Sequence, residues 1–157
     1  MEKSKKSKLW MMVGIPGSGK STYIKNMDCE DKNVISRDVI RFSMVKEDED
    51  YFSKEKEVFN EFIRQIADSV STHKNTFVDA THISKASRKK VLSRLTATLA
   101  NVEVNAIVIN VPLDVALYQN NKRTGRERVP ESAIKNMFNQ MTYPNKAEGF
   151  DHIIYIK

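Results

Sequence analysis

Short apolar runs alternate with longer amphipathic stretches along the chain. The apolar runs are rich in Val, Ile, Phe and Tyr and are bounded by polar or turn residues, a pattern typical of buried strands. They cover residues 9–13, 33–36, 75–79, 102–111 and 152–156. We therefore predict five strands.

The stretches between these runs have helical periodicity. Apolar side chains within residues 54–71 recur at spacings of one, three and four, as they do on the buried face of a helix. Helices are predicted over residues 20–27, 38–44, 54–71, 85–99, 112–123 and 130–141. Because strands alternate with helices throughout, the predicted fold is α/β, a three-layer sandwich in which helices cover both faces of a five-stranded parallel sheet.

Length and composition indicate one domain. Of the 157 residues, 40% are hydrophobic and 29% charged, with 5 Gly and 4 Pro. This composition excludes collagen-like, mostly disordered and membrane-spanning classes, so we expect a single globular domain over residues 1–157 and no membrane partner. The single cysteine, Cys29, forbids an intrachain disulfide and favours the reducing cytoplasm, and the three scattered histidines lack the spacing of zinc ligands.

The positive charge is unevenly distributed. The formal net charge is +6, and residues 1–79 carry 14 basic and 14 acidic side chains whereas residues 80–157 carry 12 and 6. An excess on one part of the chain favours a polyanionic partner, although ordinary surface solvation is an alternative. The basic residues within 1–8 are expected to form a solvated, flexible tail. The pattern does not indicate an oligomeric state.

One segment carries a phosphate-binding motif. A full match to the pattern G-x-x-x-x-G-K-[ST] stands between the first predicted strand and the first predicted helix, and it consists of Gly14, Ile15, Pro16, Gly17, Ser18, Gly19, Lys20 and Ser21. In such a loop the backbone N–H groups surround a phosphate, Lys20 reaches the β- and γ-phosphates, and the Ser21 hydroxyl binds Mg²⁺. Thr22 continues the motif into the helix. We expect ATP or a similar nucleotide, together with Mg²⁺.

The second predicted strand ends beside a candidate general base. The carboxyl ends of parallel strands line the ligand crevice of an open α/β sheet, so Asp38 should face the same cleft as the motif. A carboxylate there can accept the proton of an attacking hydroxyl. Arg41 and Arg37 are candidate contacts for an anionic group of the acceptor. The alternative is structural, with Asp38 as a helix cap and Arg41 as its ion-pair partner.

Residues after the third predicted strand belong to the same edge of the sheet. Asp79 can hold a magnesium-bound water or orient Arg41, and Thr81 and His82 are candidate acceptor contacts. For His82 the favoured interpretation is a hydrogen-bonded turn residue. Arg88, in the first turn of the following helix, is either a substrate contact or a surface charge.

A basic segment, residues 122–130, separates the last two predicted helices. It holds four basic residues around Gly125 and ends at Pro130, which predicts a short exposed lid. Arg123 or Arg126 can then close over the β- and γ-phosphates and neutralise the charge that develops during phosphoryl transfer. A solvated basic loop is the alternative.

These motifs together resemble the P-loop 5′-polynucleotide kinase family. The segments that carry the resemblance are 14–21, 37–41, 79–82, 123–126 and 129–131. The resemblance implies that Lys20 and Ser21 bind nucleotide and metal, that Asp38 is the general base for the 5′-hydroxyl, and that Arg41 binds the phosphate of the acceptor. It also implies that Arg123 and Arg126 are lid arginines.

Two departures from the family pattern are visible. In the motif after the third strand, a phage member of the family carries its acidic residue one position later, where this chain has Ala80. Successive strand residues face opposite sides of a sheet, so this shift predicts that Asp79 can point away from the site. That member also has a phosphatase domain, for which the present length leaves no room, so we expect no 3′-phosphatase activity.

The sequence hypothesis is an ATP-dependent kinase that phosphorylates the 5′-hydroxyl of DNA or RNA. The guanine-reading N-K-x-D motif of GTPases is absent, which favours a phosphotransferase over a GTPase switch. The alternatives are a P-loop kinase for a small molecule such as a nucleoside, sugar or antibiotic, and a nucleotide-dependent binding module.

Overall fold

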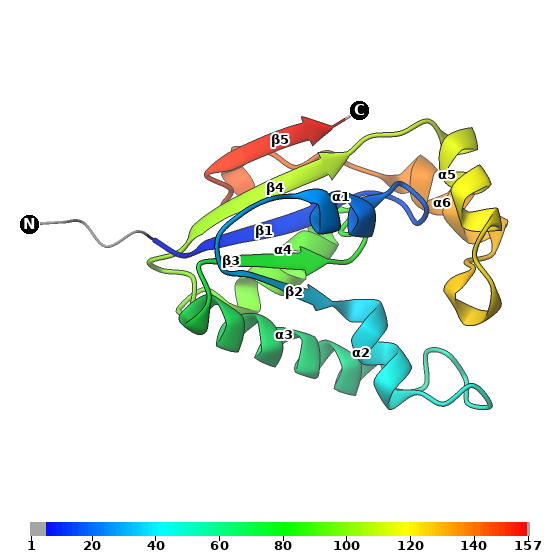
Figure 1. Cartoon of the computed structure of the whole chain (residues 1–157), viewed down its shortest axis with the longest axis horizontal. Coiled ribbons are helices and arrows are strands. Elements are labelled where there is room, and N and C mark those ends of the chain that lie inside the picture. Colours follow the sequence, from blue (N-terminus) through cyan, green and yellow to red (C-terminus); the bar gives the residue numbers. More distant parts are fainter. Residues whose placement is uncertain (1–5, 157) are drawn as a thin grey trace, which may run out of the picture.

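Five parallel strands form the centre of the molecule (Figure 1). A computed structural model describes residues 6–156, so the first part of the predicted basic tail, residues 1–5, lies outside the described residues. The sheet has the order β2-β3-β1-β4-β5, and its strands are β1 (Lys8–Val13), β2 (Lys32–Ser36), β3 (Asn75–Asp79), β4 (Glu103–Ile109) and β5 (His152–Ile156). All four strand pairs are parallel. The predicted α/β class is confirmed.

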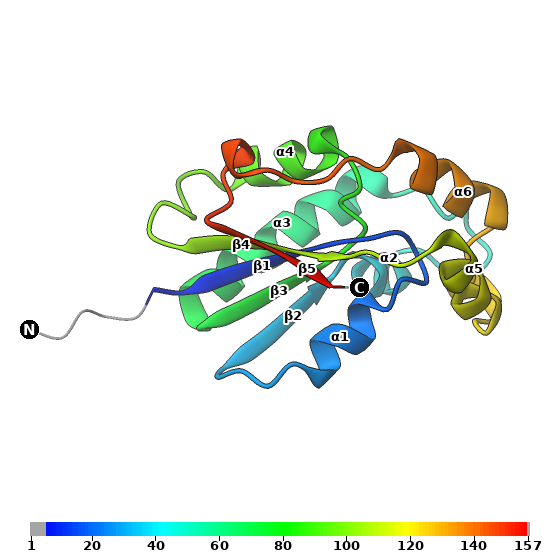
Figure 2. The ribbon, with the colours of Figure 1, turned by 90° about the horizontal axis from the view of Figure 1, so that it is seen from above.

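Helices cover both faces of this sheet, as Figure 2 shows. The helices are α1 (Lys20–Asn26), α2 (Arg37–Met44), α3 (Glu55–Thr72), α4 (Lys85–Arg94), α5 (Leu113–Asn121) and α6 (Glu131–Gln140). Two 3₁₀ turns, η1 (Gly125–Glu127) and η2 (Lys146–Glu148), complete the elements. In Figure 2, α3 and α4 lie on one side of the strands and α1 on the other, while α5 and α6 lie beyond the strand ends. None of the helices in the described part of the chain is long and apolar enough to cross a membrane.

The core follows the alternation of side chains along each strand. Leu9 and Met11 of β1 point into the larger apolar cluster beneath α3 and α4, whereas Met12 points into a smaller cluster with Ile24 of α1. A third cluster, around Ile134, joins the phosphate-binding motif to α5 and α6. Apolar packing therefore holds β1 on both of its faces and holds the loop that follows it against α5 and α6.

One predicted helix is too long. The pattern predicts a helix over residues 85–99, but α4 ends at Arg94 and residues 95–101 form turns. The Thr96 hydroxyl donates hydrogen bonds to the carbonyls of Leu92 and Ser93, so it satisfies acceptors that a longer helix would use. The other predicted helices and strands occur with boundaries that differ by at most two residues, and β3 and β5 have the predicted bounds.

The sheet brings distant segments to one edge. Ser36, the last residue of β2, pairs with Asp79, the last residue of β3, and β3 in turn pairs with β1, which leads into the phosphate-binding motif. In Figure 1 the chain leaves these three strands on the same side, where α2, α5 and α6 also lie. The strand ends thus gather the motif, the start of α2 and the residues after β3 around one space.

Candidate nucleotide and acceptor site

The phosphate-binding motif forms a tight loop packed against α5. Gly17 has φ +84, and a Cβ atom at this position would lie 2.3 Å from the carbonyl oxygen of Ala116. Gly19 has φ +98, another backbone conformation that L side chains rarely adopt. The glycines are therefore required both by the turn and by the close approach of α5.

Lys20 is a buried cation with no carboxylate in direct contact. Its Nζ donates hydrogen bonds to the carbonyl oxygens of Gly14 (2.9 Å) and Ile15 (3.0 Å), and the residue is 9% exposed. Burial lowers the pKa of Lys20 from 10.5 to about 8. The charge of Asp79 raises this pKa, that of Arg123 lowers it, and that of Asp38 raises it. Lys20 is thus within electrostatic reach of three of the predicted site residues.

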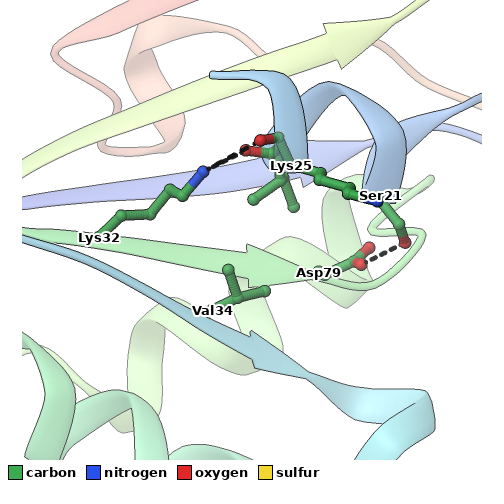
Figure 3. Close-up of a pocket in the computed structure, with 6 residues that line it drawn as sticks. Ser21, Lys25, Lys32, Val34 and Asp79 are labelled. Carbon is green, nitrogen blue, oxygen red and sulfur yellow. Dashed lines mark hydrogen bonds between the residues drawn. The ribbon is translucent and has the colours of Figure 1, made fainter. Parts of the chain in front are cut away.

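Ser21 and Asp79 form a direct pair. The Ser21 hydroxyl donates a 2.7 Å hydrogen bond to Oδ2 of Asp79, and Figure 3 shows the two side chains facing each other across the gap between α1 and the end of β3. They line a cavity of about 310 Å³ with Lys25 and Val34. The shift of the acidic residue from position 80 to Asp79 therefore does not remove it from the loop.

A second, larger cavity lies on the other side of the loop. Its volume is about 550 Å³, and it is lined by residues 17–19, by Tyr23 of α1, by Val115 and Gln119 of α5, and by Arg123. This size falls in the range of small-molecule sites. Arg123 is the predicted lid residue that the structure brings to the loop.

Asp38 lies in the first turn of α2 and is open to solvent. Ser36, and not Asp38, caps this helix, because the Ser36 hydroxyl accepts a hydrogen bond from the backbone N–H of Val39. The Asp38 side chain is 64% exposed and lies 3.2 Å from Nη1 of Arg41. Its carboxylate is accessible to a molecule that approaches the strand ends.

Arg41 connects Asp38 to the segment between α2 and α3. The Arg41 side chain is 8% exposed, and it donates hydrogen bonds to Glu55 (2.7 Å) and to the hydroxyl of Tyr51 (3.3 Å) as well as to Asp38. Its guanidinium also lies 4.8 Å from the ring centroid of Tyr51. Glu55 and Tyr51 are site residues that the sequence analysis missed, because no motif links them to α2.

Arg37 and His82 both lie close to one aromatic ring, that of Phe62. The guanidinium of Arg37 is 5.9 Å from the centroid of Phe62, and the imidazole of His82 stacks on the same ring at 6.3 Å. Arg37 pairs with Glu55 at 3.3 Å, but its Nε atom has no hydrogen-bond partner among the described residues. Burial lowers the pKa of Arg37. Arg37 is therefore a cation at the site with donor capacity to spare.

His82 is an interior residue. It is 4% exposed, has φ +45, and donates a 2.8 Å hydrogen bond from Nδ1 to the carbonyl of Met12. Burial lowers the pKa of His82 to about 4, so the ring is neutral at pH 7. The neighbouring Thr81 carbonyl accepts a hydrogen bond from the backbone N–H of Gly14. Thr81 thus holds the first residue of the phosphate-binding loop and His82 holds the end of β1, and neither is required to touch an acceptor for that role.

Arg88 is completely buried. It is 0% exposed and forms a 2.7 Å ion pair with Glu148, in addition to hydrogen bonds to the carbonyls of His82 and Thr142. A substrate cannot reach a guanidinium in this position, which argues against both roles considered from the sequence, substrate contact and surface charge. Arg88 instead ties α4 to the segment before β5.

Arg126 points away from the phosphate-binding loop. Its guanidinium donates hydrogen bonds to the carbonyls of Phe42 and Val45 at the end of α2, and it lies 4.6 Å from the Phe42 ring. Arg126 therefore links the lid segment 122–130, which lies between α5 and α6, to the end of α2. Figure 1 shows α2, α5 and α6 on the side of the molecule where the strands end. In this structure Arg123 and Arg126 have different surroundings.

The residues of the loop suit a nucleotide phosphate and a hard divalent cation. Among residues 6–156 the buried Ser18 hydroxyl has no hydrogen-bond partner and the buried Lys20 has no directly bonded carboxylate, so an anion in the loop would satisfy both. Ser21 and Asp79 offer the oxygen ligands that Mg²⁺ prefers, while the remaining positions are left to water and phosphate. Among residues 6–156 there is no group of three or more His, Cys, Asp and Glu side chains that would bind a metal without such help.

A comparison with protein families identifies the family of this chain. The model of a family described as "AAA domain" matches residues 9–144, and the chain belongs to this family.

Solved structures show the same fold. A chain of the Pnkp1/Rnl/Hen1 RNA repair complex is 24% identical with a TM-score of 0.72, and the match covers 96% of this chain and 48% of that one. Kti12 of Chaetomium thermophilum, solved with ADP-AlF3, gives 14% identity, a TM-score of 0.69 and coverages of 94% and 88%. A gluconokinase from Sinorhizobium meliloti 1021 is 14% identical with a TM-score of 0.57, and the match covers 98% of this chain and 83% of that one.

These similarities define a P-loop kinase fold. The fold implied by the resemblance to P-loop polynucleotide kinases is confirmed, and the family that the comparison shows is the one described as "AAA domain". The present chain spans less than half the length of the matched chains from the RNA repair complexes.

Proposed function

We propose that this protein is an ATP-dependent kinase that transfers the γ-phosphate of ATP to the 5′-hydroxyl of a DNA or RNA strand. The observation that carries the proposal is the placement of Asp38, an exposed carboxylate next to a buried arginine, within electrostatic reach of the phosphate-binding Lys20. A nucleotide-binding switch has no evident need for a carboxylate at this position.

The proposed reaction assigns a task to each side of the site. The acceptor oxygen forms a bond to the γ-phosphorus while the bond between that phosphorus and the leaving oxygen of ADP breaks, and Asp38 accepts the proton of the hydroxyl. Lys20 and Arg123 face the phosphates and stabilise their negative charge. Ser21 and Asp79 would hold Mg²⁺, which when bound neutralises phosphate charge.

Arg41 and Arg37 are the proposed acceptor contacts. Both lie beside Asp38 and share Glu55 as a counter-ion, which fixes the direction of their guanidinium groups. The Arg37 side chain is 27% exposed, so the open part of its guanidinium can make a charge-assisted contact with an anionic group of the acceptor.

The open surroundings of Asp38 support a large acceptor. Val39 and Phe52, which flank the site, are 66% and 63% exposed, and Phe52 lies 5.6 Å from the Arg41 guanidinium. A kinase for a small molecule usually encloses its acceptor, whereas a strand end approaches from solvent. The similarity of fold to a gluconokinase keeps a small-molecule acceptor as the alternative.

A screen of acceptors tests the proposal. The protein is incubated with γ-labelled ATP, Mg²⁺ and either 5′-hydroxyl DNA or RNA oligonucleotides or a panel of nucleosides, sugars and aminoglycosides. We expect label on the 5′ end of an oligonucleotide and none on the same oligonucleotide when it carries a 5′-phosphate. Label on a small molecule alone would show the alternative kinase, and ATP hydrolysis without any labelled acceptor would favour a binding module.

The Asp38→Asn variant tests the assigned base. Asparagine keeps the size of the side chain but accepts no proton, so kcat should fall by about 10²–10⁴ while the KM for ATP stays within a factor of two or so. Asp48→Asn, at an exposed acidic residue of the loop after α2, is the matched control and should keep the wild-type rate. A full rate in Asp38→Asn would leave Asp38 only its ion pair with Arg41.

A further inference from the structure

The outer face of α4 is basic, and its exposed cations form no ion pair with the described residues. Residues 80–102 contain no Asp or Glu, and four basic residues of α4 are exposed, namely Lys85, Lys89, Lys90 and Arg94. Within residues 6–156 none of these four forms an ion pair, and the polar partner of Arg94 is the amide oxygen of Asn60 at 3.4 Å. Surface cations of a folded protein are ordinarily interspersed with acids, so this face carries unbalanced charge.

The basic face of α4 is continuous with the acceptor side of the candidate site. Phe59 of α3 is the junction, because its ring lies 4.5 Å from Nζ of Lys90, 5.7 Å from the guanidinium of Arg94 and 5.4 Å from that of Arg37. Three cations from two helices therefore surround one buried ring. Only Arg37 among them has a carboxylate partner, Glu55.

We infer that Lys90 and Arg94, joined to Arg37 around Phe59, form a track for the sugar-phosphate backbone of a single-stranded nucleic acid. This inference rests on the proposed function, since the strand would run from its 5′ end at Asp38, past Arg37, and over α3 and α4. The terminal nucleotide engages the site itself, and the nucleotides that follow engage the track. We call the surface of Arg37, Phe59, Lys90 and Arg94 the α4 track.

Charge and geometry favour a polynucleotide backbone as the occupant. Cations without counter-ions repel one another, and a row of phosphates removes this repulsion while it releases the cations condensed on the strand. The α4 track begins at a residue of the acceptor site, so one continuous strand can occupy both. The interaction needs no base contacts and is therefore independent of sequence.

The test measures binding and does not require catalysis. A 5′-hydroxyl DNA 12-mer with a 3′ fluorophore is titrated with the full-length protein, and its anisotropy is followed from 50 to 300 mM NaCl. In Lys90→Gln/Arg94→Gln the affinity should fall roughly tenfold at 0.15 M salt, and the slope of log K against log salt should lose about 1.4, from two phosphate contacts at about 0.7 each.

A matched variant controls for net charge. Lys6→Gln/Lys74→Gln removes the same number of positive charges near the amino ends of β1 and β3, at the opposite end of the strands from the site. This control variant should bind the 12-mer like the wild type. Lys74 loses an exposed ion pair with Glu30, which stabilises the fold little. Equal weakening in both pairs would show an effect of net charge and overturn the α4 track.

The length of the acceptor separates the track from the site. Phosphorylation of a nucleoside 3′-monophosphate, which reaches only the site, should be unchanged in Lys90→Gln/Arg94→Gln, and the KM for the 12-mer should rise roughly tenfold with little change in kcat. If the wild type labels no oligonucleotide but Lys90→Gln/Arg94→Gln binds the 12-mer more weakly than the wild type does, the kinase proposal fails and the track stands. If the variant binds the 12-mer as the wild type does, the track is wrong whatever the activity.

Discussion

Lys20 is the residue whose chemistry depends most on its surroundings. It is a cation held among backbone carbonyls, and burial lowers its pKa to about 8. A phosphate in the loop would stabilise the protonated form, so proton uptake and nucleotide binding are linked at this one side chain. The Asp79 and Asp38 carboxylates favour the same protonated form from a distance.

The first prediction is a pH dependence of nucleotide affinity. If only protonated Lys20 binds the phosphates, the Kd for ATP should rise about tenfold between pH 7 and pH 9, because the free lysine loses its proton around pH 8. Isothermal titration in metal-free buffer measures this. In Lys20→Arg the guanidinium stays charged, so its Kd should not depend on pH in this range. A wild-type Kd that is flat from pH 7 to 9 would contradict the assignment.

The same pKa has a consequence for stability that does not require binding. Between pH 8 and about 10.5 the unfolded chain holds the Lys20 proton and the folded chain does not, so Lys20 makes the free energy of unfolding rise with pH in this window. Denaturant titrations should show this rise in the wild type and lack it in Lys20→Met. This measurement tests the pKa even in a variant that has lost all affinity for ATP.

At the scale of elements, the site is built where helices meet strand ends. The phosphate-binding loop follows β1, the proposed base and the two proposed acceptor arginines lie on α2, and Asp79 ends β3. The lid comes from a different part of the chain, and Arg126 binds it to carbonyls at the end of α2. Lid and acceptor helix therefore form one connected unit in this structure.

The second prediction concerns this connection. Arg126 was expected from the sequence to act on phosphate, whereas its observed hydrogen bonds suggest that it positions the lid and hence Arg123. Arg123→Ala should lower kcat by about 10²–10³, and Arg126→Ala by about tenfold. If Arg126 acts through Arg123, the double variant should be no slower than Arg123→Ala alone, because the two effects are coupled. Multiplying losses would instead show that Arg126 contacts the phosphates itself.

The strands and the loop were predictable because their signals are local. Apolar alternation defines β1 and β3, and the loop motif is contiguous, so both lie within a window of about ten residues. The partners of the arginines were not predictable. Arg88 meets Glu148, 60 positions away, and Arg126 meets Val45, 81 positions away, and such pairings depend on tertiary packing that no spacing along the chain encodes.

Glu55 and Tyr51 illustrate the same limit at the site itself. Tyr51 accepts a hydrogen bond from Arg41 at a separation of 10 residues, and Glu55 does so at a separation of 14. Both separations are longer than the three or four residues that helical periodicity brings together. Asp38 and Arg41 were identified as candidate site residues from their position alone, since both follow a strand end. Glu55 and Tyr51, which orient them, come from the start of α3 and the segment before it, and only the packing of the folded chain places them beside α2.

At the scale of the whole molecule, a bound nucleotide would contact three segments that lie far apart along the chain. The loop belongs to β1 and α1, Asp79 to β3, and Arg123 to the segment after α5, while α1 lies on the opposite face from α3 and α4. A ligand that contacts all three binds only the folded chain. Its binding free energy therefore adds to the free energy of unfolding.

The last prediction is a thermal shift with a metal-dependent part. ATP with Mg²⁺ at 100 times its Kd should stabilise the fold by about 2.7 kcal/mol, which corresponds to a Tm increase of roughly 5–10 °C for a chain of this size. EDTA should reduce the shift in the wild type, because the Ser21 hydroxyl and the Asp79 carboxylate then have no cation to hold beside the phosphates. Ser21→Ala should show the smaller shift with or without EDTA. If EDTA leaves the wild-type shift unchanged, the Ser21–Asp79 pair orders the end of β3 and does not bind the metal.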